Sequence, residues 1–99
     1  MKKGTTPTLT FSTPFLASEV EKARVVFTNN NEIVLKKEGA DCVVSDYEVT
    51  IKLTQEDTFK FECNSMASIQ VRILHKDGNA YTSDPLKMFI EQCLDDEVI

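Results

Sequence analysis

The sequence has 99 residues and a net charge of −5 at neutral pH, which excludes several classes of protein. The length fits one domain rather than two, and the 41% hydrophobic fraction is ordinary for a folded chain. An acidic chain is a poor candidate for binding nucleic acid, because such binding rests mainly on neutralising phosphates. No apolar run approaches the roughly 18 residues of a membrane span or forms the apolar part of a signal peptide. We expect a single domain, made in the cytoplasm, that binds neither nucleic acid nor a membrane.

The first half of the chain predicts short strands in which apolar and polar residues alternate. Thr6–Ser12 comes first, and because Pro7 cannot donate a ladder hydrogen bond, we expect this strand to start there or to lie at an edge. Phe15–Glu21 then has room for one short helical turn. Lys22–Thr28 and Glu32–Lys37 follow as a hairpin across three asparagines, which tolerate positive φ. We expect these inward side chains: Leu9, Phe11, Ala23, Val25 and Phe27.

Two further strands and a crossover are predicted in the middle of the chain. Asp41–Ser45 is short, and Glu48–Leu53 shows the cleanest alternation of the sequence. Thr54–Lys60 can form one or two helical turns, with Thr54 as the N-cap. So short a helix fits a crossing from one sheet to the other.

The crossover carries two aromatic residues that can reach the core. We expect Phe59 to plug the open end of the core, with Phe61 as the second candidate.

The last third of the chain predicts a hairpin with a broken return strand. Ser68–Leu74 is followed by Asp77-Gly78, the strongest short signal for a hairpin turn. The return strand starts at Ala80–Ser83, breaks at Asp84-Pro85 and resumes at Leu86–Ile90. The break indicates either an edge strand or a strand that changes sheets.

Seven or eight short strands with one helical crossover, at about residues 54–60, indicate an all-β domain. We expect residues 1–99 to form a single immunoglobulin-like antiparallel β-sandwich, with a small closed barrel as the alternative. Residues 91–99 hold four acids and no base, and we expect a solvated tail there that is loose or weakly helical. A docking role for this tail toward a basic partner is the alternative.

No arrangement of residues points to catalysis. The only histidine, His75, lies beside the Asp-Gly turn, where we expect it to be solvated. Cys42, Cys63 and Cys93 are widely spaced and lack the spacing of zinc ligands, so we interpret them as reduced thiols, with one disulfide as the alternative. We expect Cys42 and Cys63 to pack as small hydrophobic residues. The acids are expected to be solvated, and three glycines leave no phosphate-binding loop. The sequence therefore predicts no enzyme, no catalytic, cofactor-binding or metal-binding residue, and no cofactor.

Two groups of residues bear on the surface. Lys36 and Lys37 end a strand with no aromatic residues between them, and we expect both to be solvated. Val26, Val44 and Met88 are expected on the face opposite the main core, where identical subunits could assemble. The alternative is that these three residues pack under loops or under the tail.

Several segments, in this order and at this spacing, resemble a known family. They are Gly4–Phe11 with Pro14-Phe15, Leu53–Phe61, Ile69–Leu74, Asp77–Ala80 with Ser83, and Val98-Ile99. The chain resembles a family of proteins of about its own length from Gram-positive gut bacteria and their prophages, encoded among phage-type structural genes. It is also loosely similar to the immunoglobulin-like N-terminal domain of phage baseplate upper proteins. Members of the family tend to end in Gly-Val-Ile after a more basic stretch, whereas Asp95-Asp96-Glu97 precedes Val98 here.

The resemblance implies a non-enzymatic structural or accessory protein of a phage or prophage particle, of tail or baseplate type. Its partners would be other phage structural proteins or further copies of itself, and it would either become part of the particle or only aid its assembly. The family carries no known catalytic residues, so none is assigned here. The alternative is a carbohydrate- or protein-binding module unrelated to virions, for which Tyr47 and Tyr81 are the available aromatic residues.

Overall fold

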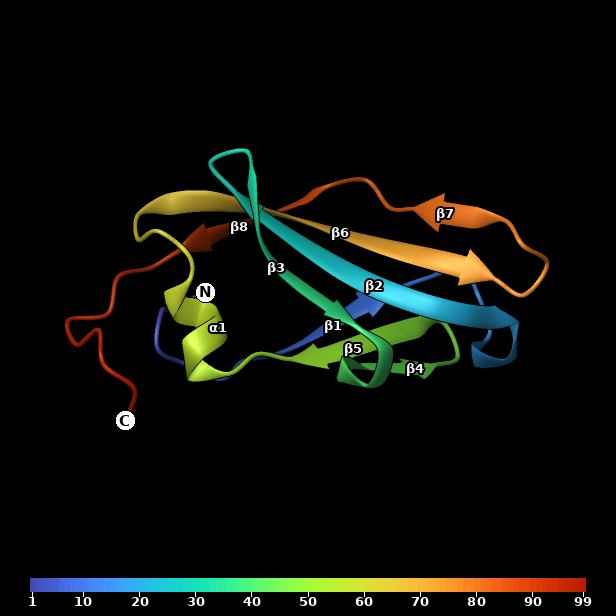
Figure 1. Cartoon of the computed structure of the whole chain (residues 1–99), viewed down its shortest axis with the longest axis horizontal. Coiled ribbons are helices and arrows are strands. Elements are labelled where there is room, and N and C mark those ends of the chain that lie inside the picture. The colour runs from blue at the N-terminus through green and yellow to red at the C-terminus, as the bar shows by residue number, and fades with distance from the viewer.

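Two antiparallel sheets form the computed structural model, which describes every residue from Met1 to Ile99 (Figure 1). One sheet has three strands in the order β1-β5-β4; the other runs β3-β2-β6-β7, and β8 also pairs with β6. One α-helix, α1 (Gln55–Phe59), and two short 3-10 helices, η1 (Ala17–Glu19) and η2 (Gly39–Asp41), connect the strands. The strands are β1 (Thr8–Ser12), β2 (Val20–Asn29), β3 (Glu32–Glu38), β4 (Cys42–Ser45), β5 (Glu48–Lys52), β6 (Ser65–His75), β7 (Ala80–Thr82) and β8 (Leu86–Ile90).

The chain changes sheets between β1 and β2, between β3 and β4, and between β5 and β6. Strands B to G of an immunoglobulin sandwich follow the same order, with B, E and D in one sheet and C′, C, F and G in the other. The immunoglobulin-like sandwich is therefore confirmed, and the closed barrel is wrong because no ladder joins the two sheets. A regular strand A is missing. Only a parallel bridge between Lys2 and Glu91 pairs the N-terminal residues with the end of β8.

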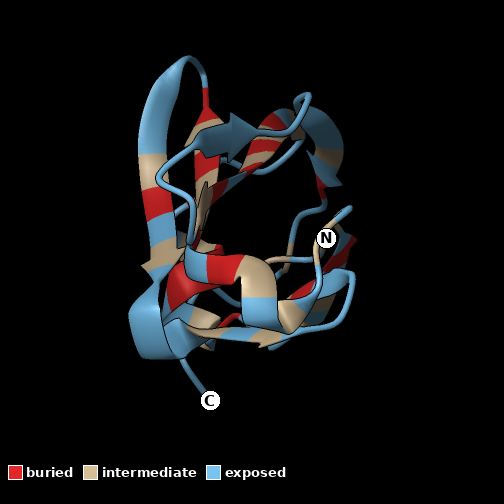
Figure 2. Cartoon of the chain, turned by 90° about the vertical axis from the view of Figure 1, so that its right-hand side faces the viewer, coloured by how far each residue is buried: buried red, intermediate tan, exposed pale blue.

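The core forms from the alternate positions that the sequence predicts. Figure 2 shows the molecule end-on, with the buried residues gathered on strands of both layers. Val25, Phe27 and Val49 are fully buried, and β2 and β6 supply much of the core from the centre of the larger sheet. The inward set predicted for Ser68–Leu74, which is Ile69, Val71 and Ile73, is buried as well.

Two residues expected on the outer face lie on the inner one. Cross-strand neighbours share a face of a sheet, and Val44 lies opposite Val49 while Met88 lies opposite Ala67. Both therefore point toward the core and pack against it. Val26 lies on the outer face of β2, as predicted. Cys63 is exposed, so its expected packing as a small hydrophobic residue is wrong, whereas Cys42 packs against the core.

The predicted crossover is α1, and its start is capped as expected. Asp57 N donates a hydrogen bond to Thr54 Oγ1 at 3.1 Å, and Thr54 N donates to Asp57 Oδ2 at 2.9 Å. Phe61, rather than Phe59, plugs the core: its side chain is 1% exposed and meets Phe27 edge-to-face at 5.7 Å. Phe59 is only partly buried, so the first choice for the plug is wrong and the second is confirmed.

The broken return strand stays at the edge of the larger sheet. β7 pairs with the second half of β6 and β8 with the first half, so the chain does not change sheets at the break. Ser83 bridges the two pieces, because its N–H donates to Val71 O at 2.9 Å and its Oγ accepts from Val71 N at 3.0 Å. Because of this contact, the backbone of Val71 stays hydrogen-bonded although the edge strand is interrupted at Asp84-Pro85.

The acidic tail forms no helix or strand after Glu91, as predicted. Both ends of the chain lie at the end of the sandwich that carries α1 (Figure 1). Gln55 holds the last residue, since Ile99 N donates to its Oε1 at 2.8 Å and its Nε2 donates to Ile99 O at 3.1 Å. The side chain of Leu94 is fully exposed.

Candidate functional site

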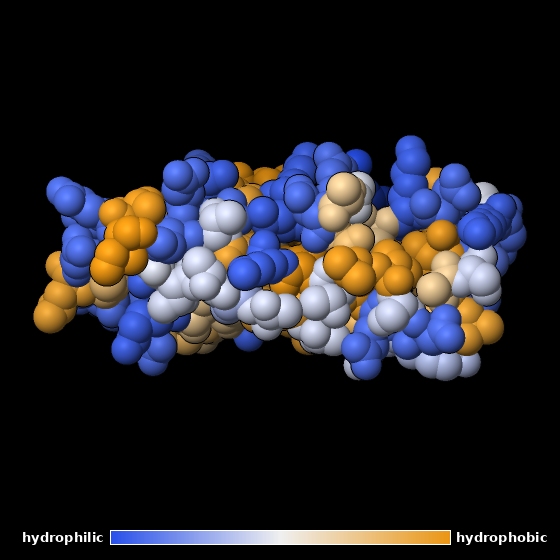
Figure 3. Space-filling model, turned by 90° about the horizontal axis from the view of Figure 1, so that it is seen from below, coloured by the Kyte–Doolittle hydropathy of each residue, from blue (hydrophilic) through white to orange (hydrophobic).

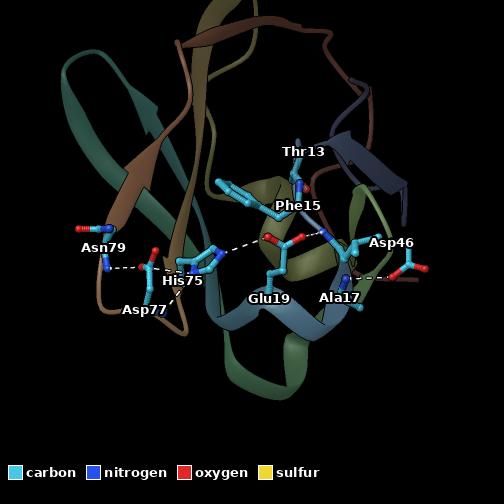
Figure 4. Close-up of polar contacts among 9 residues, drawn as sticks. Thr13, Phe15, Ala17, Glu19, Asp46, His75, Asp77 and Asn79 are labelled. Atoms are coloured by element: carbon cyan, nitrogen blue, oxygen red, sulfur yellow. Dashed lines mark hydrogen bonds and ion pairs between the residues drawn. The ribbon is translucent and has the colours of Figure 1, made fainter.

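One polar cluster gathers around His75, where β6 ends (Figure 4). His75 Nε2 lies 3.1 Å from Glu19 Oε2, and His75 Nδ1 lies 3.1 Å from both the N and Oδ1 atoms of Asp77. The Phe15 ring packs edge-on against the imidazole at 5.5 Å. The His75 side chain is only 18% exposed, so the expectation of a solvated histidine is wrong.

The protonation of this cluster follows from its hydrogen bonds. The imidazole ring contacts Glu19 through Nε2 and accepts the Asp77 N–H at Nδ1. The pKa of Glu19 lies below its usual range because the carboxylate accepts hydrogen bonds from Leu16 N and from His75. The pKa of Asp77 is lowered as well, chiefly by the Asn79 N–H. Both acids are thus held as anions, the opposite of what a general acid needs.

This cluster fastens the β6–β7 hairpin to η1. A hydrolytic site would need a hydroxyl or thiol hydrogen-bonded to the imidazole, but both ring nitrogens face Glu19 and Asp77. Lys76 N donates to Glu19 O at 2.9 Å, which adds a backbone link to the side-chain contacts. The cluster therefore has a structural role, because it joins two segments that are distant in the sequence.

A second charged contact joins β3 to α1. Lys37 Nζ lies 2.7 Å from Asp57 Oδ2, with the two side chains 13% and 11% exposed. Burial alone would raise the pKa of Asp57, but the Lys37 ammonium and the Thr54 N–H hold it below its usual range. The expected solvation of Lys37 and of Asp57 is therefore wrong. The two charges neutralise each other and the Asp57 carboxylate also caps the helix, so the pair serves the fold.

Two grooves indent the surface. The larger, of about 680 Å³, lies beside β2 and β4 past the end of β3 and is lined by Cys42 and Val44. Its charged rim is partly closed by the ion pair between Arg24 and Glu38, at 2.6 Å. The smaller, of about 250 Å³, lies between the end of β1 and β7, with Tyr81 among its walls. The charged side chains that line the larger groove are Glu21, Lys22, Arg24, Glu38 and Arg72, whereas hydroxyl and apolar side chains line the smaller one.

Other chemistry-bearing residues stay apart. The three cysteines are free, and no group of three or more His, Cys, Asp or Glu side chains is placed to hold a metal ion. Tyr47 and Tyr81 are 54% and 43% exposed, and the Tyr81 ring packs against Phe15 at 4.8 Å. No helix is long and apolar enough to cross a membrane.

The sheet edges differ sharply in how they are protected. Native proteins block edge strands with charges, prolines, bulges or short length, because unpaired N–H and C=O groups recruit further strands. β3 carries four charged residues, β4 has four residues in all, and β7–β8 is broken at Asp84-Pro85. β1 is also short, with five residues, Thr8–Ser12, and lies between Pro7 and Pro14, but it holds no charge, proline or bulge of its own and pairs only with β5.

The backbone of β1 offers three residues to a partner strand. Leu53 N donates to Pro7 O, and Thr13 N donates to Tyr47 O, so the odd-numbered residues of β1 face β5. The N–H and C=O groups of Thr8, Thr10 and Ser12 therefore point to the free edge. Figure 3, which views the molecule from below, shows pale residues across its middle beside hydrophobic (orange) and hydrophilic (blue) ones.

The sequence predicted part of this arrangement, because Pro7 cannot donate to a ladder and indicated that the strand starts there or lies at an edge. β1 does lie at the edge of its sheet. Sequence reasoning missed that this edge is free of charge, although the signal was present: no charged residue occurs from Gly4 to Ser18.

The chain matches no protein-family model, no curated protein and no solved structure.

Proposed function

We propose that this protein is a structural or accessory component of a phage or prophage particle, of tail or baseplate type, that acts through protein–protein contacts. The observation that carries the proposal is the free, uncharged edge of β1. Sheet edges of this kind bind other chains by adding strands, and main-chain hydrogen bonds supply the affinity. The resemblance of the sequence to phage-associated proteins supplies the biological setting.

The placement of the charged groups supports contact rather than chemistry. His75, Glu19 and Asp77 bond to one another, and Lys37 and Asp57 form a pair that links β3 to α1. The acids of this set are held as anions. The free backbone N–H and C=O groups along the edge of β1 are suited to recognise another polypeptide.

Particle fractionation tests the proposed function. We expect the protein to band with intact tails or baseplates on a density gradient, in a fixed ratio to the major tail protein, and to be detected there by mass spectrometry. A lysate from a host lacking the prophage is the control for accidental co-sedimentation. Absence of the protein from both particles and assembly intermediates would contradict the proposal.

A further inference from the structure

The unpaired edge of β1 is suited to one partner in particular. We infer that β1 of one copy pairs antiparallel with β1 of a second copy, about a twofold axis at Thr10. The two three-stranded sheets then join into one continuous sheet with the order β4-β5-β1-β1-β5-β4. The inference rests on the proposed function, since it names the contact through which this protein assembles.

In this register every outward backbone N–H and C=O group of β1 forms a hydrogen bond with the second copy. The outward residues Thr8, Thr10 and Ser12 are symmetric about Thr10, so a twofold axis there pairs Thr10 with its own copy and Thr8 with Ser12 of the other chain. Each N–H of these three residues then donates to a C=O of the second copy. No outward donor or acceptor of β1 stays unpaired, and the edge strand becomes a central one.

The side chains fit the same register. On the inner face Leu9 lies opposite Phe11 of the second copy, and the reverse pair lies on the other side of the axis, so two apolar cross-strand pairs form beside the core. On the outer face Thr10 lies opposite Thr10, which extends the row begun by the 3.1 Å hydrogen bond between the hydroxyls of Thr10 and Thr50. Small hydroxyl side chains leave room for the close approach.

The distribution of charged residues favours a second copy of the chain as the partner of β1. Two chains of net charge −5 repel over most of their surfaces, and the segment Gly4–Ser18 holds no charge at all. On the outer face Glu48 lies beside Ser12 and Lys52 beside Thr8, so the antiparallel register places Glu48 of each copy in one row with Lys52 of the other. A parallel register would put like charges in the same rows.

The surface area buried between the two copies determines how tightly we expect them to bind. Strand pairing over five residues buries well under the total of about 1,200 Å² that a stable complex needs. We therefore expect a dimer that forms as concentration rises and dissociates on dilution.

Sedimentation equilibrium on two matched variants tests the inference. Thr10→Lys places two ammonium groups opposite each other at the axis and should weaken dimerisation about tenfold or more. Thr50→Lys is the control: it removes the same Thr10–Thr50 hydrogen bond and adds the same charge, but its position is one strand away from the contact. The wild-type protein and Thr50→Lys should dimerise alike between about 10 µM and 1 mM, the range of weak interfaces. Equal thermal unfolding of the two variants shows that both are folded.

Amide hydrogen exchange locates the contact. The N–H groups of Thr8, Thr10 and Ser12 should exchange quickly in dilute solution and slowly in the concentrated dimer, while those of Leu9 and Phe11 stay protected in both. A protein that stays monomeric throughout the range overturns the inference. So does a dimer that both variants weaken equally, or one in which the Thr10 amide stays unprotected. A monomer that still bands with particles overturns this inference alone, whereas a Thr10-dependent dimer that is absent from particles overturns the proposed function alone.

Discussion

At the residue scale, the contact between Lys37 and Asp57 links β3, the helix cap and the crossover between sheets. Replacing Asp57 with Asn leaves the Lys37 ammonium without its partner in a largely buried position and weakens the cap of α1. We expect a loss of about 2–3 kcal/mol in the free energy of unfolding at pH 7, between the cost of a lost cap and that of a broken buried pair. Urea unfolding measures this difference. Glu56→Gln, which changes an exposed acid in the same turn, should cost little.

The same carboxylate gives stability a defined pH dependence. The folded protein holds the pKa of Asp57 below its ordinary value of 3.8, so its contribution is present above that value and is lost as pH falls through the folded one. The free energy of unfolding of wild type should therefore fall toward that of Asp57→Asn below about pH 4. Glu56→Gln should keep the wild-type profile. A constant gap between wild type and Asp57→Asn across this range would contradict the assignment.

At the element scale, the side chain of Ser83 supports the break between β7 and β8 together with its own backbone N–H. Ser83→Ala removes the Oγ that accepts the Val71 N–H at 3.0 Å, which leaves a backbone donor beside a buried side chain without a partner. We expect a cost of about 1–2 kcal/mol in the free energy of unfolding, measured by urea denaturation, and faster exchange of the Val71 amide. Ser45→Ala, at an exposed strand position, is the matched control. Unchanged exchange at Val71 would show that the backbone bridges the break unaided.

Alternation, turn residues and caps act locally, and most elements could therefore be predicted from the sequence. Asp77-Gly78 specifies the hairpin, Thr54 and Asp57 specify the start of α1, and the alternating runs specify the strands. Pro7 indicated the edge position of β1, but the partners of each strand depend on contacts distant in the sequence, so neither the pairing of β1 with β5 nor the inner position of Val44 could be predicted in this way. The link between His75 and Glu19, 56 positions apart, is missed for the same reason.

At the scale of the whole molecule, the two sheets need a plug where α1 crosses between them. Phe61 and Phe59 lie two residues apart on this crossover, but only Phe61 is buried, against Phe27 of β2. Burial of a whole phenyl ring among close-packed neighbours leaves a large cavity on truncation, so we expect Phe61→Ala to cost about 3–5 kcal/mol. Phe59→Ala, at a partly exposed position, should cost clearly less.

Thermal and urea unfolding of these two variants compare the two sites on one crossover. The loss at Phe61 is a large share of the roughly 5–15 kcal/mol by which a native domain is stable, so the variant should melt far below wild type. Because the cavity opens between the sheets, the loss should appear as one cooperative transition rather than as local fraying of α1. An equal loss in both variants would show that Phe59 and Phe61 fill the core together. A larger loss for Phe59→Ala would show that Phe59 is the plug, as the sequence first indicated.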